Sequence, residues 1–380
     1  MITVIPLLMF CSAALFLSPY IAKAFKLPIS VCEILLGVLG ASLGILKGNA
    51  DFNLVATVGF YYLMFIAGLE VDIRAFLKIK KRLAQQCLLY LIIIYLLSSM
   101  IVLYIDLSLV FIIMFPIMSV GLLSMLFKDF GKNEEWLNTA MLVGTLGEII
   151  SIVLLTLLSS FNQENATALS IFISIVYFIG FIIIFVMIYK LADIFFWWFP
   201  KIKKILMPNQ DKAEKDLRLC LALFIFIIAI MLYFHLEIAF GVFLSGAYIR
   251  AFFAHKKDLE HKLSSLGYGF LIPIFFMYIG STFDIISLLN YEALRLCALI
   301  SISMFVVRLI SSLVFLKDFG LKKTTLFSLS KSMPLTLLIA TSSLSLKANI
   351  IDSTTYSALV LSALIEAMIA MSLISFISKR

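Results

Sequence analysis

Apolar runs long enough to cross a membrane recur along this chain of 380 residues. A helix needs about 20 apolar residues to cross the hydrocarbon core of a bilayer. Hydrophobic residues make up 63% of the chain and charged residues 14%, whereas a soluble domain has roughly 45–50% and 25%. The sequence therefore predicts an all-α membrane protein and excludes nucleic-acid binding, a cytosolic enzyme and a secreted disulfide scaffold. The runs predict about thirteen transmembrane helices, called spans 1 to 13, at residues 3–22, 27–46, 54–73, 83–105, 108–127, 136–159, 168–189, 217–234, 236–253, 266–283, 292–316, 325–346 and 353–377.

Lysine and arginine residues gather in alternate connections between these spans. Of the 30 basic residues, 25 lie in connections that follow odd-numbered spans or at the C-terminus. Because basic connections stay on the cytoplasmic side, the pattern predicts an outside N-terminus and a cytoplasmic C-terminus. The net charge of +8 follows from this orientation and needs no anionic partner. The five cysteines lie in apolar runs without a CxxC spacing, so we expect neither a metal site nor a redox role.

Sequence matches between spans that lie seven apart indicate an internal repeat. Because seven is odd, the second copy would enter the membrane from the opposite side, which is the inverted-topology repeat of secondary transporters. Channels and intramembrane enzymes do not require such a repeat. The matched residues are Glu33 and Gly37 with Glu237 and Gly241 at an offset of 204, Asp72 with Asp284 at 212, and Pro116 and Glu148 with Pro334 and Glu366 at 218.

Ionisable residues inside the predicted spans are the first candidates for function, because each costs several kcal/mol in lipid. Glu148 lies near the middle of span 6. A carboxylate at that depth can hold a proton or a metal cation but not both at once, which is the requirement for exchange. For Glu33 a structural hydrogen bond is at least as good an explanation, and for Glu70 an interfacial helix end is the better one. The complete set is Glu33, Glu70, Glu148, Arg308, Lys331 and Glu366.

Two of these residues are basic. Arg308 cannot lose its charge, so it must pair with a carboxylate or with carbonyl groups. Glu148 and Glu366 are the acids available to it near the middle of the membrane. Lys331 lies about two turns from the cytoplasmic end of span 12, so its side chain either reaches that surface or serves the site.

Prolines interrupt spans 5 and 12 at matching positions. Pro116 is followed by Ser119 and Gly121, and Pro334 follows a Ser-Lys-Ser triplet that contains Lys331. Proline removes a backbone donor, while glycine and serine tolerate an irregular turn. Interrupted spans in both halves indicate a transporter's binding site, because the freed carbonyl groups can coordinate a cation. Simple helix kinks are the alternative.

Motifs in several spans are similar to those of a known family. Residues 65–72 read FIAGLEVD, residues 241–246 read GVFLSG and residues 273–280 read PIFFMYIG. Residues 33–44 (EILLGVLGASLG) match more loosely, because the proline of the family's pattern is absent. On these motifs the chain resembles the monovalent cation:proton antiporter-2 family, part of the sodium/proton antiporter superfamily, along nearly its whole length.

The resemblance implies a homodimer in a bacterial inner membrane, with two crossed broken helices and an elevator-type movement. A dimer or scaffold domain would comprise residues 1–82 and 217–290, and a mobile ion-transport core would comprise residues 83–160 and 291–380. Residues 161–216 would form a linker helix and an interfacial cytoplasmic segment. The substrates would be a monovalent cation and H⁺, in contact with the lipid bilayer, and no cofactor is implied.

The resemblance also implies an ion site. The family's acid pair in span 6 matches Gly147 and Glu148, its Thr-Ser pair in the broken helix matches Met118 and Ser119, and its basic partner matches Arg308. Glycine in place of the first acid leaves one titrating carboxylate and deprives Arg308 of its usual partner. The expected ion and proton ligands are therefore Glu148, Ser119 and the backbone at Met118, supported by Gly147, Arg308, Glu366, Lys331, Pro116, Gly121 and Pro334.

These observations support three functional hypotheses. The first is electroneutral exchange of one Na⁺ or K⁺ for one H⁺, with Glu148 binding each in turn. The second is a transport-inactive or sensory membrane homologue, because Gly147 and Met118 depart from the family's pattern. The third is a potassium efflux system regulated by a separate subunit. An enzyme is not expected, because the sequence has no HExxH motif or paired aspartates.

Overall fold

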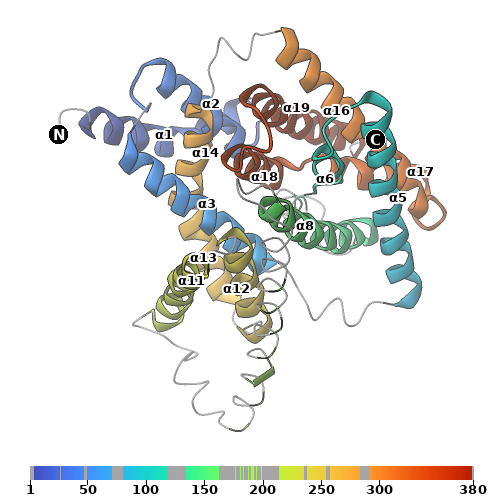
Figure 1. Ribbon diagram of the computed structural model, residues 1–380, viewed down its shortest axis with the longest axis horizontal. Helices are drawn as coiled ribbons and strands as arrows, with labels where there is room; N and C mark the ends of the chain where they lie inside the picture. The colour runs from blue at the N-terminus through green and yellow to red at the C-terminus, as the bar shows by residue number, and fades with distance from the viewer. Residues whose placement is uncertain are drawn as a thin grey trace. The chain divides into compact units, whose positions relative to one another are not determined.

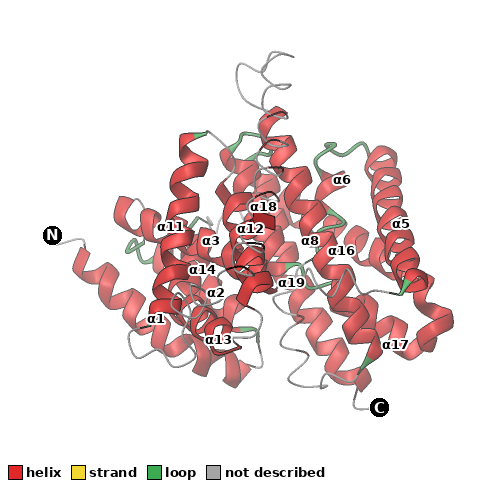
Figure 2. Ribbon diagram, turned by 90° about the horizontal axis from the view of Figure 1, so that it is seen from below, coloured by secondary structure: helices red, strands yellow, loops and turns green. Residues whose placement is uncertain are grey.

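The computed structural model describes residues 4–25, 27–46, 49–70, 80–118, 134–161, 214–234, 238–253, 257–282 and 291–378, with a few further residues between 123 and 198. Every regular element in these ranges is helical, as predicted (Figure 2). The elements are α1 (Val4–Phe25), α2 (Ile29–Ser42), α3 (Ala50–Glu70), α5 (Lys81–Ile105), α6 (Phe111–Met114), α8 (Glu135–Phe161), α11 (Lys215–Tyr233), α12 (Ile238–Phe253), α13 (Lys257–Leu266), the π-helix η1 (Gly267–Leu271), α14 (Ile272–Ser281), α16 (Tyr291–Ser312), the 3₁₀-helix η2 (Leu313–Phe315), α17 (Leu316–Lys331), α18 (Leu335–Lys347) and α19 (Ser353–Ser378).

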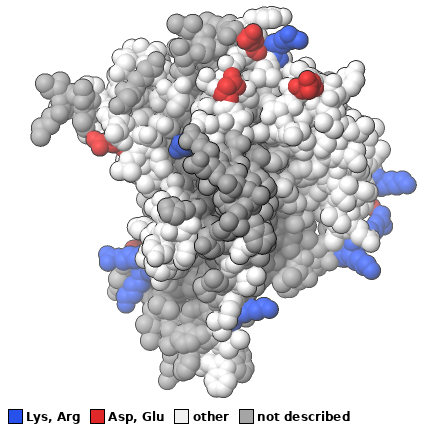
Figure 3. Space-filling view, viewed as in Figure 1, with Lys and Arg blue, Asp and Glu red and all other residues white. Residues whose placement is uncertain are grey.

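The lengths and the exposed apolar side chains of the helices agree with an environment of lipid. Within the described ranges, seven helices are long and apolar enough to cross a membrane, and α5, α11 and α19 begin and end within about two residues of spans 4, 8 and 13. Large apolar side chains such as Leu103 and Phe226 are at least 60% exposed, and uncharged surface covers most of the described part of the face in Figure 3. The total of thirteen spans and the internal repeat stay predictions.

The helix α13 lies in a stretch that the sequence analysis assigns to a connection. Asp258 and Glu260 stand in its first turn, whereas Leu259 and Leu263 are buried. The Tyr62 hydroxyl donates a hydrogen bond to the Leu263 carbonyl at 3.1 Å. The helix then continues through η1 into α14, so the predicted span 10 has an amphipathic extension at its N-terminal end.

The chain separates into two compact units. Unit 1 comprises Met1–Asn53, Phe76–Leu155 and Phe276–Arg380, and unit 2 comprises Leu54–Ala75 and Thr156–Phe275. Each unit therefore contains segments from both halves of the chain. The predicted division into a scaffold domain and a transport core, with boundaries at residues 82, 160, 216 and 290, stays a prediction.

In unit 2, the helices α3 and α12 meet backbone to backbone. A Cβ atom added to Gly68 would overlap the Phe243 carbonyl oxygen, and one added to Gly246 would overlap the Phe65 carbonyl oxygen. Glycine at such positions lets two helix axes approach more closely than any side chain would allow. These two glycines are therefore required by the packing of the motifs that carry the family resemblance.

Unit 1 contains a second seam of the same kind and all the described candidate site residues. A Cβ atom added to Gly37 of α2 would overlap the Met277 carbonyl oxygen of α14, and one added to Gly280 would overlap that of Ile34. Elsewhere in unit 1, α16 packs against α19, α5 and α17, and α18 packs against α19 (Figure 1). The interruption at Pro334 lies between α17 and α18, and Arg308 of α16 contacts the interruption at Pro116.

Candidate functional site

The first interruption lies directly after the short helix α6. Helical structure ends at Met114, Phe115 and Pro116 form a turn, and Ile117 and Met118 are non-helical. Pro116 has no backbone N–H and cannot continue the ladder of hydrogen bonds. The break predicted at Pro116 is therefore confirmed, while Ser119 and Gly121 lie outside the described residues.

Arg308 of α16 holds this first break. Its side chain is completely buried, and Nη2 donates to the Ile117 carbonyl oxygen at 2.8 Å and to that of Phe115 at 3.4 Å. Nη1 donates to Glu366 Oε2 of α19 at 2.7 Å. The guanidinium group thus joins the two carbonyl groups on either side of the proline to a carboxylate on another helix.

The pairing of Arg308 with Glu366 answers a question that the sequence left open. The family resemblance implies a partner at position 147, where this chain has glycine. In the structure Glu366 supplies the negative charge instead, and both side chains are at most 5% exposed. A buried arginine needs such a partner, because an uncompensated charge in this environment is strongly destabilising.

The second interruption separates α17 from α18. The helix α17 ends at Lys331, Ser332 to Pro334 are non-helical, and α18 begins at Leu335. The Leu338 amide donates to the Pro334 carbonyl oxygen at 2.8 Å, which starts the new helix. The break predicted near Pro334 is confirmed, and the two interrupted segments touch where the Thr341 hydroxyl donates to the Met114 sulfur at 3.7 Å.

Lys331 points into the protein at this second break. It is 1% exposed, and its Nζ donates to the Ala140 carbonyl oxygen of α8. The ammonium group also interacts electrostatically with Glu148. The structure therefore does not support a side chain that reaches the membrane surface, and the role of Lys331 in the site stays a prediction.

Glu148 lies on α8 and is 2% exposed. A Cβ atom added to its neighbour Gly147 would lie 2.9 Å from Cε and 3.2 Å from Sδ of Met118. The Met118 side chain thus fills the space beside the glycine. Met118, Gly147, Glu148 and Lys331 form one neighbourhood, to which each of the two breaks contributes a residue.

The arrangement can provide oxygen ligands and a group that takes up a proton. A buried carboxylate next to interrupted helices is a common donor set for a monovalent cation in a membrane. The sequence pattern did not identify the carbonyl groups of Phe115, Ile117 and Ala140, because a backbone carbonyl carries no signature in the sequence. Only the prolines and the isolated basic residues pointed toward them.

Two acids outside this neighbourhood have ordinary structural surroundings. Glu33 of α2 is buried and hydrogen-bonds to the Ser18 side chain of α1. Glu70 is the last residue of α3 and is half-buried. These places agree with the structural explanation for both residues.

The chain is similar to known transport proteins. The profile of the family "Sodium/hydrogen exchanger, transmembrane" matches residues 12–380. The chain is 24% identical over 387 residues to "Putative Na(+)/H(+) antiporter YjbQ" of Bacillus subtilis (strain 168), which covers 93% of this chain. It spans only 59% of that relative's length. It is also 24% identical over 323 residues to "Probable Na(+)/H(+) antiporter 3" of Methanocaldococcus jannaschii, covering 80% of this chain and 78% of that protein.

A solved structure shares the fold. The sodium proton antiporter MjNhaP1 of Methanocaldococcus jannaschii at pH 8 superimposes with a TM-score of 0.69, covering 99% of both chains at 16% sequence identity. The match along both full lengths agrees with the sodium/proton antiporter fold expected from the motifs. Because the family profile covers nearly the whole sequence, this chain belongs to the family of transmembrane sodium/hydrogen exchangers.

Proposed function

We propose that this protein exchanges a monovalent cation, Na⁺ or K⁺, for H⁺, with the Glu148 carboxylate binding the two in turn. The observation that carries the proposal is the place of Glu148: it is buried on α8, beside Met118 of the first break and Lys331 of the second. A carboxylate in this setting gains from neutralisation by either a proton or a cation. Ser119 and the backbone near Met118 would complete the coordination of the cation.

We further propose that one cation is exchanged for one proton without net movement of charge. Glu366 is already paired with Arg308 at 2.7 Å, and position 147 offers no second carboxylate. This leaves Glu148 as the acid of the site whose charge changes during the cycle. The mechanism would be alternating access of the elevator type in a homodimer, with the C-terminus in the cytoplasm of a bacterium.

Purified protein in liposomes with a lumenal pH-sensitive dye would test this proposal. Addition of Na⁺ or K⁺ outside should drive protons out of the lumen, and Glu148→Gln should reduce the signal to that of empty liposomes. Glu33→Gln is the matched control, because Glu33 is also a buried acid but lies on α2 with a Ser18 partner. Full flux in folded Glu148→Gln protein would contradict the proposal. A series with Li⁺, Na⁺, K⁺ and Rb⁺ would identify the ion.

A specific observation favours a second candidate function, that of a transport-inactive or sensory protein. Met118 fills the space beside Gly147, where the family resemblance implies a first acid. Expression in a salt-sensitive strain that lacks its own antiporters distinguishes the two functions, because only an active exchanger would restore growth. Unitary currents in planar bilayers would instead indicate the third hypothesis, a potassium efflux system regulated by a separate subunit.

A further inference from the structure

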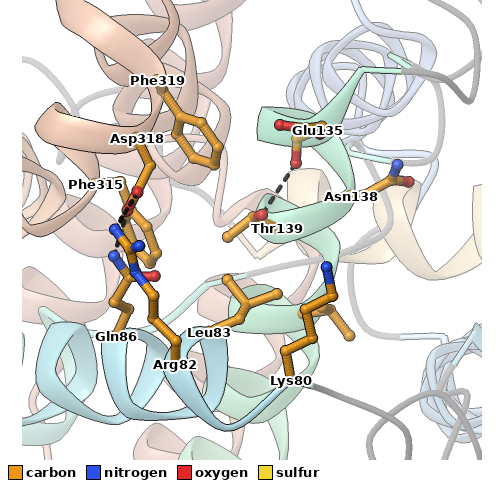
Figure 4. Close-up of a pocket in the computed structure, with 11 residues that line it drawn as sticks. Lys80, Arg82, Leu83, Gln86, Glu135, Asn138, Thr139, Phe315, Asp318 and Phe319 are labelled. Atoms are coloured by element: carbon orange, nitrogen blue, oxygen red, sulfur yellow. Dashed lines mark hydrogen bonds and ion pairs between the residues drawn. The ribbon is translucent and has the colours of Figure 1, made fainter.

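A charged cleft of 520 Å³ opens in unit 1 beside the N-terminal ends of α5 and α8. Its walls carry Arg82 and Gln86 of α5, Glu135 and Thr139 of α8, and Asp318 and Phe319 of α17 (Figure 4). These ends adjoin the basic connections that the positive-inside rule assigns to the cytoplasm. The cleft is therefore a place where water and hydrated ions can approach α8 from the predicted cytoplasmic side.

An ion pair crosses one wall of the cleft. Arg82 Nη2 lies 2.7 Å from Asp318 Oδ1, and Gln86 donates to the other carboxylate oxygen, as the dashed lines in Figure 4 show. Two residues further on, Gly320 has a φ of +70°, which interrupts the helical backbone of α17. Asp318 thus ties the first turns of α17 to α5, next to a joint that glycine makes possible.

A cluster of four aromatic rings continues from the cleft into the protein: Tyr90, Phe315, Phe319 and Phe327. The Phe315 and Phe319 rings stack at 5.7 Å, and the Phe315 and Phe327 centroids are 4.8 Å apart. The Tyr90 ring meets Phe327 edge-on at 5.6 Å. Phe319 is half-exposed in the cleft, whereas the other three rings are completely buried.

The ring cluster leads directly to the candidate ion site. Lys331 follows Phe327 by one helical turn, and its Nζ lies 5.8 Å from the centre of the Phe327 ring. The same Nζ donates to the Ala140 carbonyl oxygen and interacts with Glu148. Successive contacts therefore connect the charged cleft, the rings, Lys331 and Glu148.

We propose that the charged cleft is the cytoplasmic mouth of the ion pathway and that the ring cluster is its closed barrier. The Arg82–Asp318 pair acts as the latch that keeps α17 and its rings against α5. Packed apolar groups close a pathway by excluding the water that a cation needs around it. The identity of the ion rests on the proposed function, whereas the position of the barrier can be tested without transport.

The native Cys87 provides a reporter for this test. It is completely buried on α5, one turn beyond Leu83, which lines the cleft, and it interacts electrostatically with Lys331. The experiment uses the full chain with Cys87 as its single cysteine, in right-side-out and inverted membrane vesicles. A membrane-impermeant maleimide then reports how often water reaches Cys87 from each side. The other four cysteines, Cys11, Cys32, Cys220 and Cys297, are replaced by alanine.

Opening the barrier should expose Cys87 on the predicted cytoplasmic side. We expect Phe327→Ala to accelerate labelling about tenfold in inverted vesicles, because a closed state that opens only rarely becomes more often open. Phe376→Ala is the matched control, since this ring is 57% exposed on α19 and outside the cluster. Leu83→Cys in a chain without Cys87 should react quickly in every variant, which shows that the reagent reaches the mouth.

The latch is tested by exchanging its charges. Arg82→Asp should accelerate the labelling of Cys87, and the double variant Arg82→Asp/Asp318→Arg should return it to the original rate. The Arg82 side chain is 77% exposed and that of Asp318 is 30% exposed, so these variants test the latch even if Phe327→Ala fails to fold. Restoration by the reversed pair would show that the ion pair itself, and not either residue alone, sets the labelling rate.

Several results would overturn the proposal. Slow labelling of Cys87 in both folded Phe327→Ala and Arg82→Asp protein would show that the rings are no barrier. Acceleration only in right-side-out vesicles would place the mouth on the other side. In Glu148→Gln protein, which should have lost exchange, Phe327→Ala should still accelerate the labelling of Cys87. Failure of the proposed function and failure of the barrier therefore give different results.

Discussion

The two interrupted helices are held by basic side chains in different ways. At the first break, the Arg308 guanidinium contacts the carbonyl groups of Phe115 and Ile117 and the Glu366 carboxylate. At the second break, the Lys331 ammonium donates a hydrogen bond to the Ala140 carbonyl group and interacts electrostatically with Glu148. Arginine keeps a fixed planar fork, whereas a lysine ammonium is a compact charge on a flexible stem. The comparison indicates a rigid first break and a second break that can respond to changes at Glu148.

Breaking the Arg308–Glu366 pair should have the largest effect. Arg308→Met leaves a buried carboxylate and two carbonyl groups without their donor, so we expect a loss of stability of about 3–5 kcal/mol. Thermal unfolding of the purified protein in detergent measures this loss. The double variant Arg308→Met/Glu366→Leu should recover part of it, because no uncompensated charge remains. Equal stabilities of the single and double variants would show that the pair does not hold the first break.

Removing the Lys331 charge should have a smaller effect on stability. Lys331→Met loses one charge-assisted hydrogen bond, for which we expect about 1.5–3 kcal/mol. It also removes a positive charge near Glu148, so the apparent affinity for the cation should rise. Unfolding and dye-monitored flux against cation concentration measure the two effects. A loss as large as that of Arg308→Met, with unchanged cation affinity, would contradict the proposed difference between the breaks.

A second acid beside Glu148 should change the charge moved in each cycle. In Gly147→Asp the new side chain meets Met118, so we expect a loss of about 1–3 kcal/mol from overpacking. Adding Met118→Thr removes the conflict, and the double variant should bind a second proton. Its exchange rate should then depend on an imposed membrane potential, whereas the original protein should show no such dependence. A potential-dependent rate in the unaltered chain would disprove electroneutral exchange.

The smallest expected effect lies outside the membrane, at the start of the helix that carries Glu366. Asp352 precedes α19, and hydrogen bonding from the Thr355 side chain, with a further bond from the Thr355 amide at 3.1 Å, lowers the pKa of its carboxyl group. Because the folded-state pKa is lowered, the stabilisation is present above the ordinary Asp pKa of about 3.9 and is lost as the pH falls through the folded-state value.

We expect Asp352→Ala to cost no more than about 1 kcal/mol at neutral pH, since the carboxylate is exposed and screened. The difference from the original protein in thermal unfolding should narrow below about pH 4. Asp352→Asn is the control, because it keeps an acceptor at the helix start and removes the titration. A loss comparable with that of Lys331→Met would show that the start of α19 governs the first break, contrary to the comparison above.

The positions of the breaks and of the central acid were predictable from the sequence. Pro116 and Pro334 stand in otherwise apolar runs, and a proline there has one physical consequence, the loss of a backbone donor. The burial of Glu148 was predictable, because an acid far from both ends of an apolar span cannot reach the membrane surface and is costly to expose to lipid. In each case the information lies in one residue and its distance from the ends of a span.

The partners of these residues were not predictable. Arg308 had two candidate acids, and the choice of Glu366 depends on how α16 packs against α19, which span lengths do not determine. The partner of Lys331 is a backbone carbonyl group, and every residue has one. The contact of Met118 with Gly147 required the relative register of α6 and α8. Ser119 and Gly121 lie outside the described residues, so their roles stay predictions.

The glycine seams described above limit how the protein can move. Where α3 meets α12, and where α2 meets α14, the two backbones are in direct contact at glycines, with no side chain between them. Sliding one helix along its partner would drive carbonyl oxygens into Cα atoms. The two helices of each pair must therefore move together as one rigid body. A movement that carries an ion across the membrane must therefore take place at helix contacts other than these two.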